Sequence, residues 1–214
     1  YDLRPEDGDE TFSFALQMSA RGFIVVMIDY LGLGESTRPA DCYALTPEVL
    51  THAAINASAH LLFKLRKGSL SPALPAMPAL KSLGIGHSMG AMMTTLHQAA
   101  AKQHEGIALL GFSTRGLPAY LPPKVVAMTR EEQRAGLAGF AQKMFQTQYP
   151  VIRSSGNGES VYGSKKAEPK GVAALKQATD CLLPVTAYLS MLPGNVAPEA
   201  ATVSVPVLLA HVER

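Results

Sequence analysis

The chain has 214 residues, of which 47% are hydrophobic, and this length and composition can bury one substantial core. Its 19 basic and 17 acidic residues leave a net charge of +2, and no run of like charges indicates a nucleic-acid or membrane-surface partner. Cys42 and Cys181 are too few for a disulfide framework, and no spacing indicates a metal site or a cofactor. No apolar stretch is long enough to span a bilayer and no signal-peptide pattern is present, so we expect by default a soluble, cytoplasmic protein.

The first predicted elements are a helix, a strand and a turn. Apolar residues recur at helical spacing over Glu10–Ala20, and Gly22 marks the end of that helix. The continuous apolar run Phe23–Ile28 is typical of a parallel strand that is buried on both faces. Asp29–Ser36 predicts a sharp turn, because its glycines can take positive φ, and Asp29 is expected to hold that turn.

The middle of the chain alternates helices and strands. A long helix is predicted between Thr46, a good N-cap, and Gly68, which follows three basic residues. Leu80–Ile85 predicts a strand, Ala91–Lys102 a helix, and Ile107–Phe112 a second buried strand. This alternation favours a mostly parallel sheet with crossover helices on both faces.

From residue 115 to residue 201 the pattern is mainly helical, and one more strand follows. A Thr129–Glu132 capping box predicts a helix that runs to Gln148, and Arg153–Lys170 predicts a polar loop. Val172–Met191 predicts a helical stretch that is broken at Pro184. Val203–Ala210 predicts a strand, with Pro206 near its start. We therefore expect an α/β core of residues 1–114 and 202–214 and a helical cap of residues 115–201.

The segment Gly86-His87-Ser88-Met89-Gly90 matches the G-x-S-x-G nucleophile elbow. Such a serine sits on a strained turn between a strand and a helix, where its hydroxyl stands clear of the sheet. The residues two before and two after it, here Gly86 and Gly90, must be small because the strand and helix backbones pass close together. The N–H of Met89 would stabilise an oxyanion, and His87 would line the substrate site. The plain alternative is a tight strand–helix turn with a buried serine.

With this elbow the sequence resembles the α/β-hydrolase superfamily, in the branch with a GHSMG elbow and a helical cap. Asp29–Ser36 is similar to the family's D-x-x-G-x-G-x-S turn, and Val205–His211 is similar to its penultimate core strand. The resemblance implies that the second oxyanion loop lies before Tyr1 and that the triad acid and histidine lie beyond Arg214. We therefore expect a chain that is truncated at both ends.

No other residue is an obvious partner for Ser88. His87 adjoins it, but neighbouring side chains diverge, whereas His211 lies at the carboxyl end of a predicted strand. Glu213 is the carboxylate nearest to the expected acid position. The remaining histidines, His52, His60, His97 and His104, are expected on helices away from the site, and Asp41 and Asp180 are expected at the surface. The methionines Met89, Met92, Met93, Met128, Met144 and Met191 would either line an apolar acyl pocket or, as the simpler reading, pack in the core.

The sequence thus predicts a serine hydrolase that acts on a carboxylic ester or a related small hydrophobic acyl compound, with Ser88 as nucleophile and Met89 as oxyanion donor. Its expected partner is that small substrate, with no nucleic acid and no membrane. The alternative comes from a different class: a non-catalytic protein of the same fold, or an inactive fragment, that binds a ligand or a partner.

Overall fold

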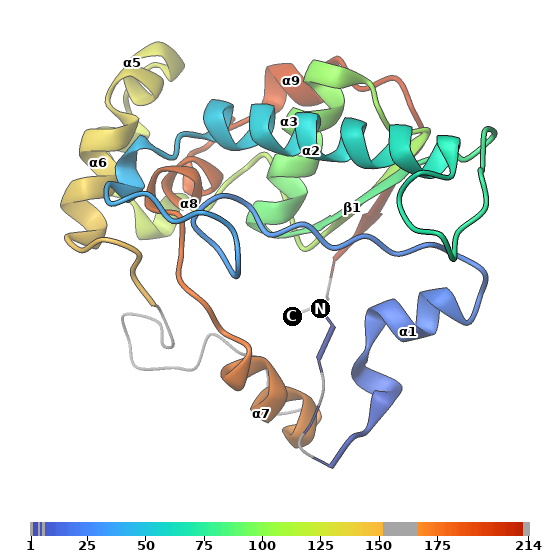
Figure 1. The fold of residues 1–214 in the computed structure, drawn as a ribbon. Coiled ribbons are helices and arrows are strands. Elements are labelled where there is room, and N and C mark those ends of the chain that lie inside the picture. The colour runs from blue at the N-terminus through green and yellow to red at the C-terminus, as the bar shows by residue number, and fades with distance from the viewer. Residues whose placement is uncertain (1, 4, 6, 152–166, 212–214) are drawn as a thin grey trace.

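The computed structural model describes residues 2–3, 5, 7–151 and 167–211. In this part of the chain it is an α/β structure with nine α-helices and a three-stranded parallel sheet (Figure 1). The strands are β1 (Leu83–His87), β2 (Gly106–Leu110) and β3 (Val207–Ala210), and they pair in the order β1-β2-β3. The predicted α/β class and the parallel pairing are confirmed.

The register of the sheet brings the carboxyl ends of its strands level with one another. His87 pairs with Leu110, and Leu110 pairs with Ala210. The next residue of each strand therefore lies on the same edge of the sheet. Pro206 stands immediately before β3, where its carbonyl accepts a hydrogen bond of 3.0 Å from the Ile107 N–H. Because it precedes the strand, its missing N–H interrupts no ladder bond, as predicted.

Helix α2 (Pro47–Lys67) has the predicted ends. The Thr46 hydroxyl accepts a hydrogen bond of 3.3 Å from the Val49 N–H, which satisfies one of the free donors of the first turn. Gly68 ends the helix with a φ of 67°, a left-handed conformation that glycine adopts without strain. Leu50 and Leu65 are buried on the inner side.

Helix α3 (Met89–Ala101) covers one face of the sheet and is in turn packed against α2. Met92 and Met93 are fully buried, and Ile107 and Leu109 of β2 are buried beneath the helix. Helix α9 (Ala197–Ala201) also packs on α3. These helices lie on a single face.

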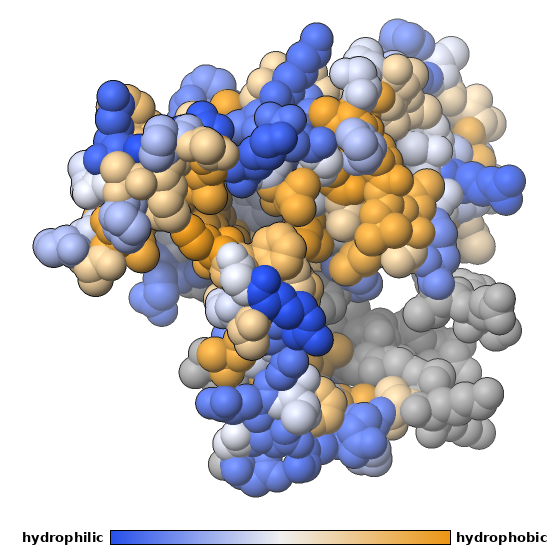
Figure 2. Space-filling model, turned by 90° about the vertical axis from the view of Figure 1, so that its right-hand side faces the viewer, coloured by the Kyte–Doolittle hydropathy of each residue, from blue (hydrophilic) through white to orange (hydrophobic). Residues whose placement is uncertain are grey.

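The opposite face of the sheet is exposed in the described structure. Side chains alternate between the faces along a strand, and Leu83, Ile85 and Leu208 are 59%, 46% and 62% exposed. Figure 2 shows hydrophobic side chains gathered in a broad area on the side of the molecule that lies to the right in Figure 1. The expected helices on both faces are therefore not found among the described residues.

The predicted strand Phe23–Ile28 is not a strand. The segment forms no sheet ladder, and Figure 1 shows it as an extended trace running below α2. Five of its six side chains are exposed by 41–62%. The apolar pattern describes a segment that would be buried between partners, and none of the described residues pairs with it. The prediction is wrong because this partner is missing among the described residues.

The N-terminal helix is present in a shorter, interrupted form. A 3₁₀ turn η1 (Glu10–Phe12) is followed by α1 (Phe14–Ser19), and the Ser13 hydroxyl caps α1 by accepting from the Leu16 N–H at 3.1 Å. Gly22 has a φ of 86°, as expected of a residue that ends a helix.

The helical region begins with η3 (Pro118–Tyr120) and α4 (Pro123–Val126). The capping box is confirmed: Thr129 and Glu132 each accept a hydrogen bond from the other's backbone N–H. The helix that it opens is shorter than predicted, because Gly136 divides it into α5 (Arg130–Ala135) and α6 (Leu137–Phe145).

The later helices follow the prolines. Helix α7 (Pro169–Gln177) and helix α8 (Pro184–Met191) both have proline in the first turn. The predicted break between them is present, but it covers residues 178–183, and Pro184 begins the second helix. Most of the predicted polar loop lies outside the described residues, and its last two residues, 169 and 170, belong to α7.

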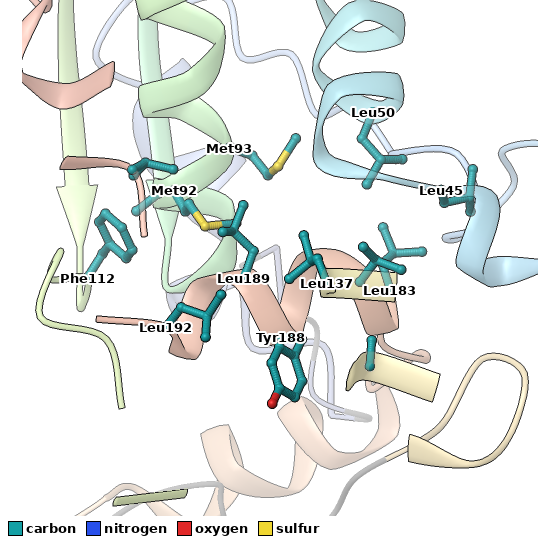
Figure 3. Close-up of a cluster of buried hydrophobic side chains, with 14 of the residues drawn as sticks. Leu45, Leu50, Met92, Met93, Phe112, Leu137, Leu183, Tyr188, Leu189 and Leu192 are labelled. Carbon is teal, nitrogen blue, oxygen red and sulfur yellow. The ribbon is translucent and has the colours of Figure 1, made fainter. Parts of the chain in front are cut away.

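One hydrophobic core joins both parts of the predicted architecture (Figure 3). Leu50, Met92 and Met93 from α2 and α3 share a cluster with Tyr188 and Leu189 from α8. The packing interpretation is thus confirmed for Met92 and Met93, which are at most 1% exposed. The division into a core and a cap of residues 115–201 stays a prediction, and any such cap shares its interior with the core.

Candidate nucleophile elbow

Ser88 lies at the junction of a strand and a helix. It directly follows β1 and directly precedes α3, at the carboxyl edge of the sheet. Its backbone has φ 52° and ψ −121°, a conformation that residues with a side chain rarely adopt. Such strain costs on the order of 1–3 kcal/mol and persists only where the surroundings impose it. This is the strained turn that the sequence predicts.

Hydrogen bonds on both sides of Ser88 hold it in this conformation. Its N–H donates to the Leu110 carbonyl at 2.8 Å, which extends the ladder between β1 and β2 by one residue. Its carbonyl accepts from the N–H groups of Ala91 at 2.9 Å and Met92 at 3.2 Å, which begins α3. The sheet and the helix together impose the turn.

Gly86 lies where the strand passes closest to the helix. A Cβ atom at this position would lie 2.3 Å from the Gly90 carbonyl oxygen and 2.5 Å from the Thr94 hydroxyl, so no side chain fits. The Thr94 hydroxyl donates to the same Gly90 carbonyl at 2.9 Å. A Cβ atom on Gly90, by contrast, would meet nothing within 4 Å. The steric requirement is confirmed for Gly86 and wrong for Gly90.

The Ser88 side chain is exposed, and its hydroxyl forms no helix-capping hydrogen bond. Met89 is the first residue of α3, so its N–H has no partner within the helix. The aligned peptide dipoles of a helix place partial positive charge at its N-terminus. The arrangement therefore combines an accessible hydroxyl with a donor that can stabilise negative charge beside it.

His87 lies next to Ser88 in the chain, but its ring lies against a different strand. A Cβ atom added to Gly111, the residue after β2, would be 3.1 Å from His87 Nε2. Burial lowers the pKa of His87 below its ordinary value of 6.5, which favours a neutral ring at neutral pH. Its role in binding substrate stays a prediction.

Four histidines lie away from Ser88. His52 and His60 are exposed on α2. His97 and His104 are separated from Ser88 by roughly 13–20 Å of helix, from the rise of about 1.5 Å per residue. The prediction that these four lie away from the site is confirmed, but His104 lies in the connection between α3 and β2 and not on a helix.

His211 directly follows β3 and so lies on the same edge of the sheet as Ser88. Strand β2 separates them, which places their backbones roughly 10 Å apart at a strand spacing of about 4.8 Å. Among the described residues, no histidine forms a hydrogen bond with Ser88.

The glycine turn after residue 28 has the predicted structure, and Asp29 has the predicted role. Asp29 Oδ2 accepts from the Glu35 N–H at 3.3 Å, and the Asp29 carbonyl accepts from the Ser36 hydroxyl at 2.7 Å. Gly32 and Gly34 have φ values of 90° and 50°. A Cβ atom on Gly34 would lie 2.0 Å from Asp29 Oδ2, so only glycine fits there.

Asp180 has a role that the sequence did not indicate. Its carboxylate accepts from the Gly34 N–H at 2.8 Å and forms an ion pair of 3.2 Å with Arg38, which joins the glycine turn to the segment before α8. The Gly34 hydrogen bond is the main cause that lowers the pKa of Asp180. Asp41 caps a 3₁₀ turn, η2 (Cys42–Ala44), by accepting from the Tyr43 N–H at 2.9 Å. Glu213, the predicted acid position, lies outside the described residues.

Two hollows of the described structure are not lined by the elbow. One of about 230 Å³ lies between Asp7 and Lys170 of α7, and one of about 150 Å³ lies between Tyr30 and Leu50 of α2. Within residues 2–3, 5, 7–151 and 167–211, no group of three His, Cys, Asp or Glu side chains could hold a metal ion. No helix in the same ranges has the length and apolarity to cross a bilayer.

Comparison with known proteins adds no family assignment. No family model matches the sequence, and no curated protein matches it at a significant level. The candidate site is therefore defined by its own geometry.

Proposed function

We propose that this chain carries the nucleophile of a serine hydrolase with the α/β-hydrolase fold, acting on a carboxylic ester or a related small hydrophobic acyl compound. The observation that supports it most is the backbone of Ser88, at φ 52° and ψ −121° between β1 and α3. Glycine adopts this conformation with little strain, so a turn without a chemical task is better served by glycine. A serine that is held there and exposed indicates a use for its hydroxyl.

The proposed reaction begins with attack of Ser88 Oγ on the carbonyl carbon of the substrate. The carbonyl oxygen becomes negatively charged, and the Met89 N–H at the start of α3 donates a hydrogen bond to it. Collapse of the tetrahedral intermediate releases the alcohol and leaves an acyl group on Ser88, which water then hydrolyses. A histidine accepts the hydroxyl proton and returns it to the alcohol. This base is not one of His52, His60, His97 and His104, because these four histidines lie away from Ser88.

The proposal includes the finer architecture. Residues 1–114 and 202–214 would form the core of the hydrolase fold, and residues 115–201 its helical cap. The carboxyl edge of a parallel sheet, where Ser88 lies, is the common place for sites in this class of fold. The register of β1, β2 and β3 aligns their carboxyl ends at this edge, which supports this location.

The second candidate is a non-catalytic protein of the same fold that binds a partner. The exposed apolar face of the sheet, with Leu83, Ile85 and Leu208, is the observation that favours it, because large exposed apolar areas commonly mark interaction surfaces. The two candidates differ in whether Ser88 is chemically reactive.

A fluorophosphonate probe, which labels activated serines, separates these candidates. We expect the full-length protein to be labelled and the Ser88→Ala variant to lose the label. Ser82→Ala is the matched control, because Ser82 Oγ lies 2.6 Å from His104 Nδ1 but occupies no strained turn. Labelling that survives in Ser88→Ala, or that disappears in Ser82→Ala alone, would refute the assignment.

Residues 1–214 alone should hydrolyse a p-nitrophenyl ester slowly or not at all, because no histidine among the described residues forms a hydrogen bond with Ser88. Rapid turnover would show that a histidine within the chain serves as the base. His211→Gln would then be the first variant to examine, since His211 shares the sheet edge with Ser88.

A further inference from the structure

A second cluster of polar side chains lies at the end of α3 opposite Ser88. His97, on the last turns of α3, is only 7% exposed, and His104 lies in the short connection from α3 to β2. Their ring centroids are 4.8 Å apart and the ring planes are tilted by 34°. Two imidazoles at this distance cannot both become charged without repelling one another.

Hydrogen bonds connect this pair to α2. Gln103 Oε1 lies 2.5 Å from His97 Nε2, and it accepts a hydrogen bond of 2.9 Å from the Ser58 hydroxyl on α2. The side chain of Gln103 therefore ties the connection to two helices at once.

The backbone of the connection is held equally closely. The His104 N–H donates to Gln98 Oε1 at 2.9 Å, and Gln98 Nε2 donates to the His104 carbonyl at 3.0 Å. On the other side, the Ser82 hydroxyl lies 2.6 Å from His104 Nδ1, and the Ser82 carbonyl accepts from the Glu105 N–H at 2.8 Å. A Cβ atom on Gly84 would lie 2.8 Å from His104 Cδ2, so the His104 ring packs directly against β1.

We propose that the His97–His104 pair is a pH-sensitive switch that holds residues 102–105 against α2, α3 and the start of β1 while both rings are neutral, and releases this connection when they are protonated. The proposal does not depend on the function assigned to Ser88.

The direction of the pH dependence follows from burial. Burial lowers the pKa of His97, and burial together with the nearby His97 ring lowers the pKa of His104 to about 4. In the released connection each histidine would return to its ordinary pKa of about 6.5. The closed state is therefore favoured above pH 6.5, and this preference is lost as the pH falls from 6.5 toward 4.

Among the described residues, no other charge contributes to the pKa shift of either ring. Lys81, Lys102 and Glu105 are exposed neighbours along the chain, and none of them contributes to the pKa shift of either ring. No charged side chain of α2 contributes either. At the opposite end of α3, Met92 and Ile107 pack in the hydrophobic core and do not titrate, so this end should not respond to pH.

Amide hydrogen exchange, corrected for the intrinsic pH dependence of exchange, tests the switch at pH 7 and pH 4.5. The reporters are the His104 and Glu105 N–H groups, and the controls are those of Ser88 and Gly111, which donate to the Leu110 and Ala210 carbonyls at 2.8 Å. We expect the protection factors of the reporters to fall by roughly ten- to fifty-fold at pH 4.5, from the difference in proton binding between the closed and open states. The controls should change far less.

A variant pair identifies the group responsible. His97→Gln removes one charge from the pair and should reduce the loss of protection at pH 4.5 at least threefold. His52→Gln, a change at an exposed histidine of α2, should leave that loss unchanged. Unchanged protection of His104 and Glu105 in the unmodified chain would overturn the proposal. An equal loss at all four amides would also overturn it, because that result describes global acid unfolding.

Discussion

Gly86→Ala is expected to destabilise the chain more than any other single-methyl change at the elbow. The new Cβ atom would lie 2.3 Å from the Gly90 carbonyl oxygen, whereas an ordinary contact begins at 3.4 Å. Strand β1 and helix α3 would have to separate by about 1 Å, and overpacking of this kind costs ~1–3 kcal/mol. The hydrogen bond from Ser88 N to the Leu110 carbonyl would be disturbed as well. We therefore expect the free energy of unfolding to fall by roughly 2–3 kcal/mol.

Gly90→Ala is the matched control, because it adds the same methyl group four residues away, where nothing lies within 4 Å. Replacing a helical glycine by alanine stabilises by roughly 0.5–1 kcal/mol. Urea unfolding followed by circular dichroism measures both variants, and a difference of roughly 3 kcal/mol corresponds to midpoints about 1–3 M apart. Equal midpoints for Gly86→Ala and Gly90→Ala would refute the close approach of strand and helix as the reason for Gly86.

Two further predictions concern the strain at Ser88 and the shared core. Ser88→Gly should raise the free energy of unfolding by about 1 kcal/mol relative to Ser88→Ala, since glycine relieves a φ of 52° and alanine does not; equal stabilities would contradict the strain. Leu189→Ala should cost ~2–5 kcal/mol in a single cooperative transition, because Leu189 is fully buried in the cluster that joins both parts of the chain, while Leu70→Ala at an exposed site should cost far less. A second, separate transition in Leu189→Ala would show that residues 115–201 unfold on their own.

Local signals predicted the ends of the elements well. The N-cap Thr46, the closing Gly68 and the Thr129–Glu132 capping box each act through hydrogen bonds or dihedral angles within a few residues. Pro184 begins α8 because its ring suits the first turn of a helix, whereas α7 already ends at Gln177. The strained conformation of Ser88 could also be predicted, since the G-x-S-x-G spacing describes a local turn.

Features that depend on distant residues could not be predicted in the same way. The apolar run Phe23–Ile28 has the composition of a buried strand, but pairing requires a partner that composition cannot supply. Asp180 is exposed as predicted, but its hydrogen bond with Gly34 could not be predicted because the two residues are 146 positions apart. The prediction for Gly90 is wrong because the motif treats both glycines alike, whereas only Gly86 lies close to the backbone of the neighbouring helix.

From the exposed run Phe23–Ile28 we expect the chain to aggregate at high concentration. A segment of six apolar residues with no charge and no proline can stack with copies of itself into intermolecular sheets. Charges that flank such a segment oppose this stacking, because they repel one another when copies align. Arg21 and Asp29, both exposed, are the charges that bound this run. Asp29 therefore has a second task beyond shaping the glycine turn, which is to limit self-association of the segment that precedes it.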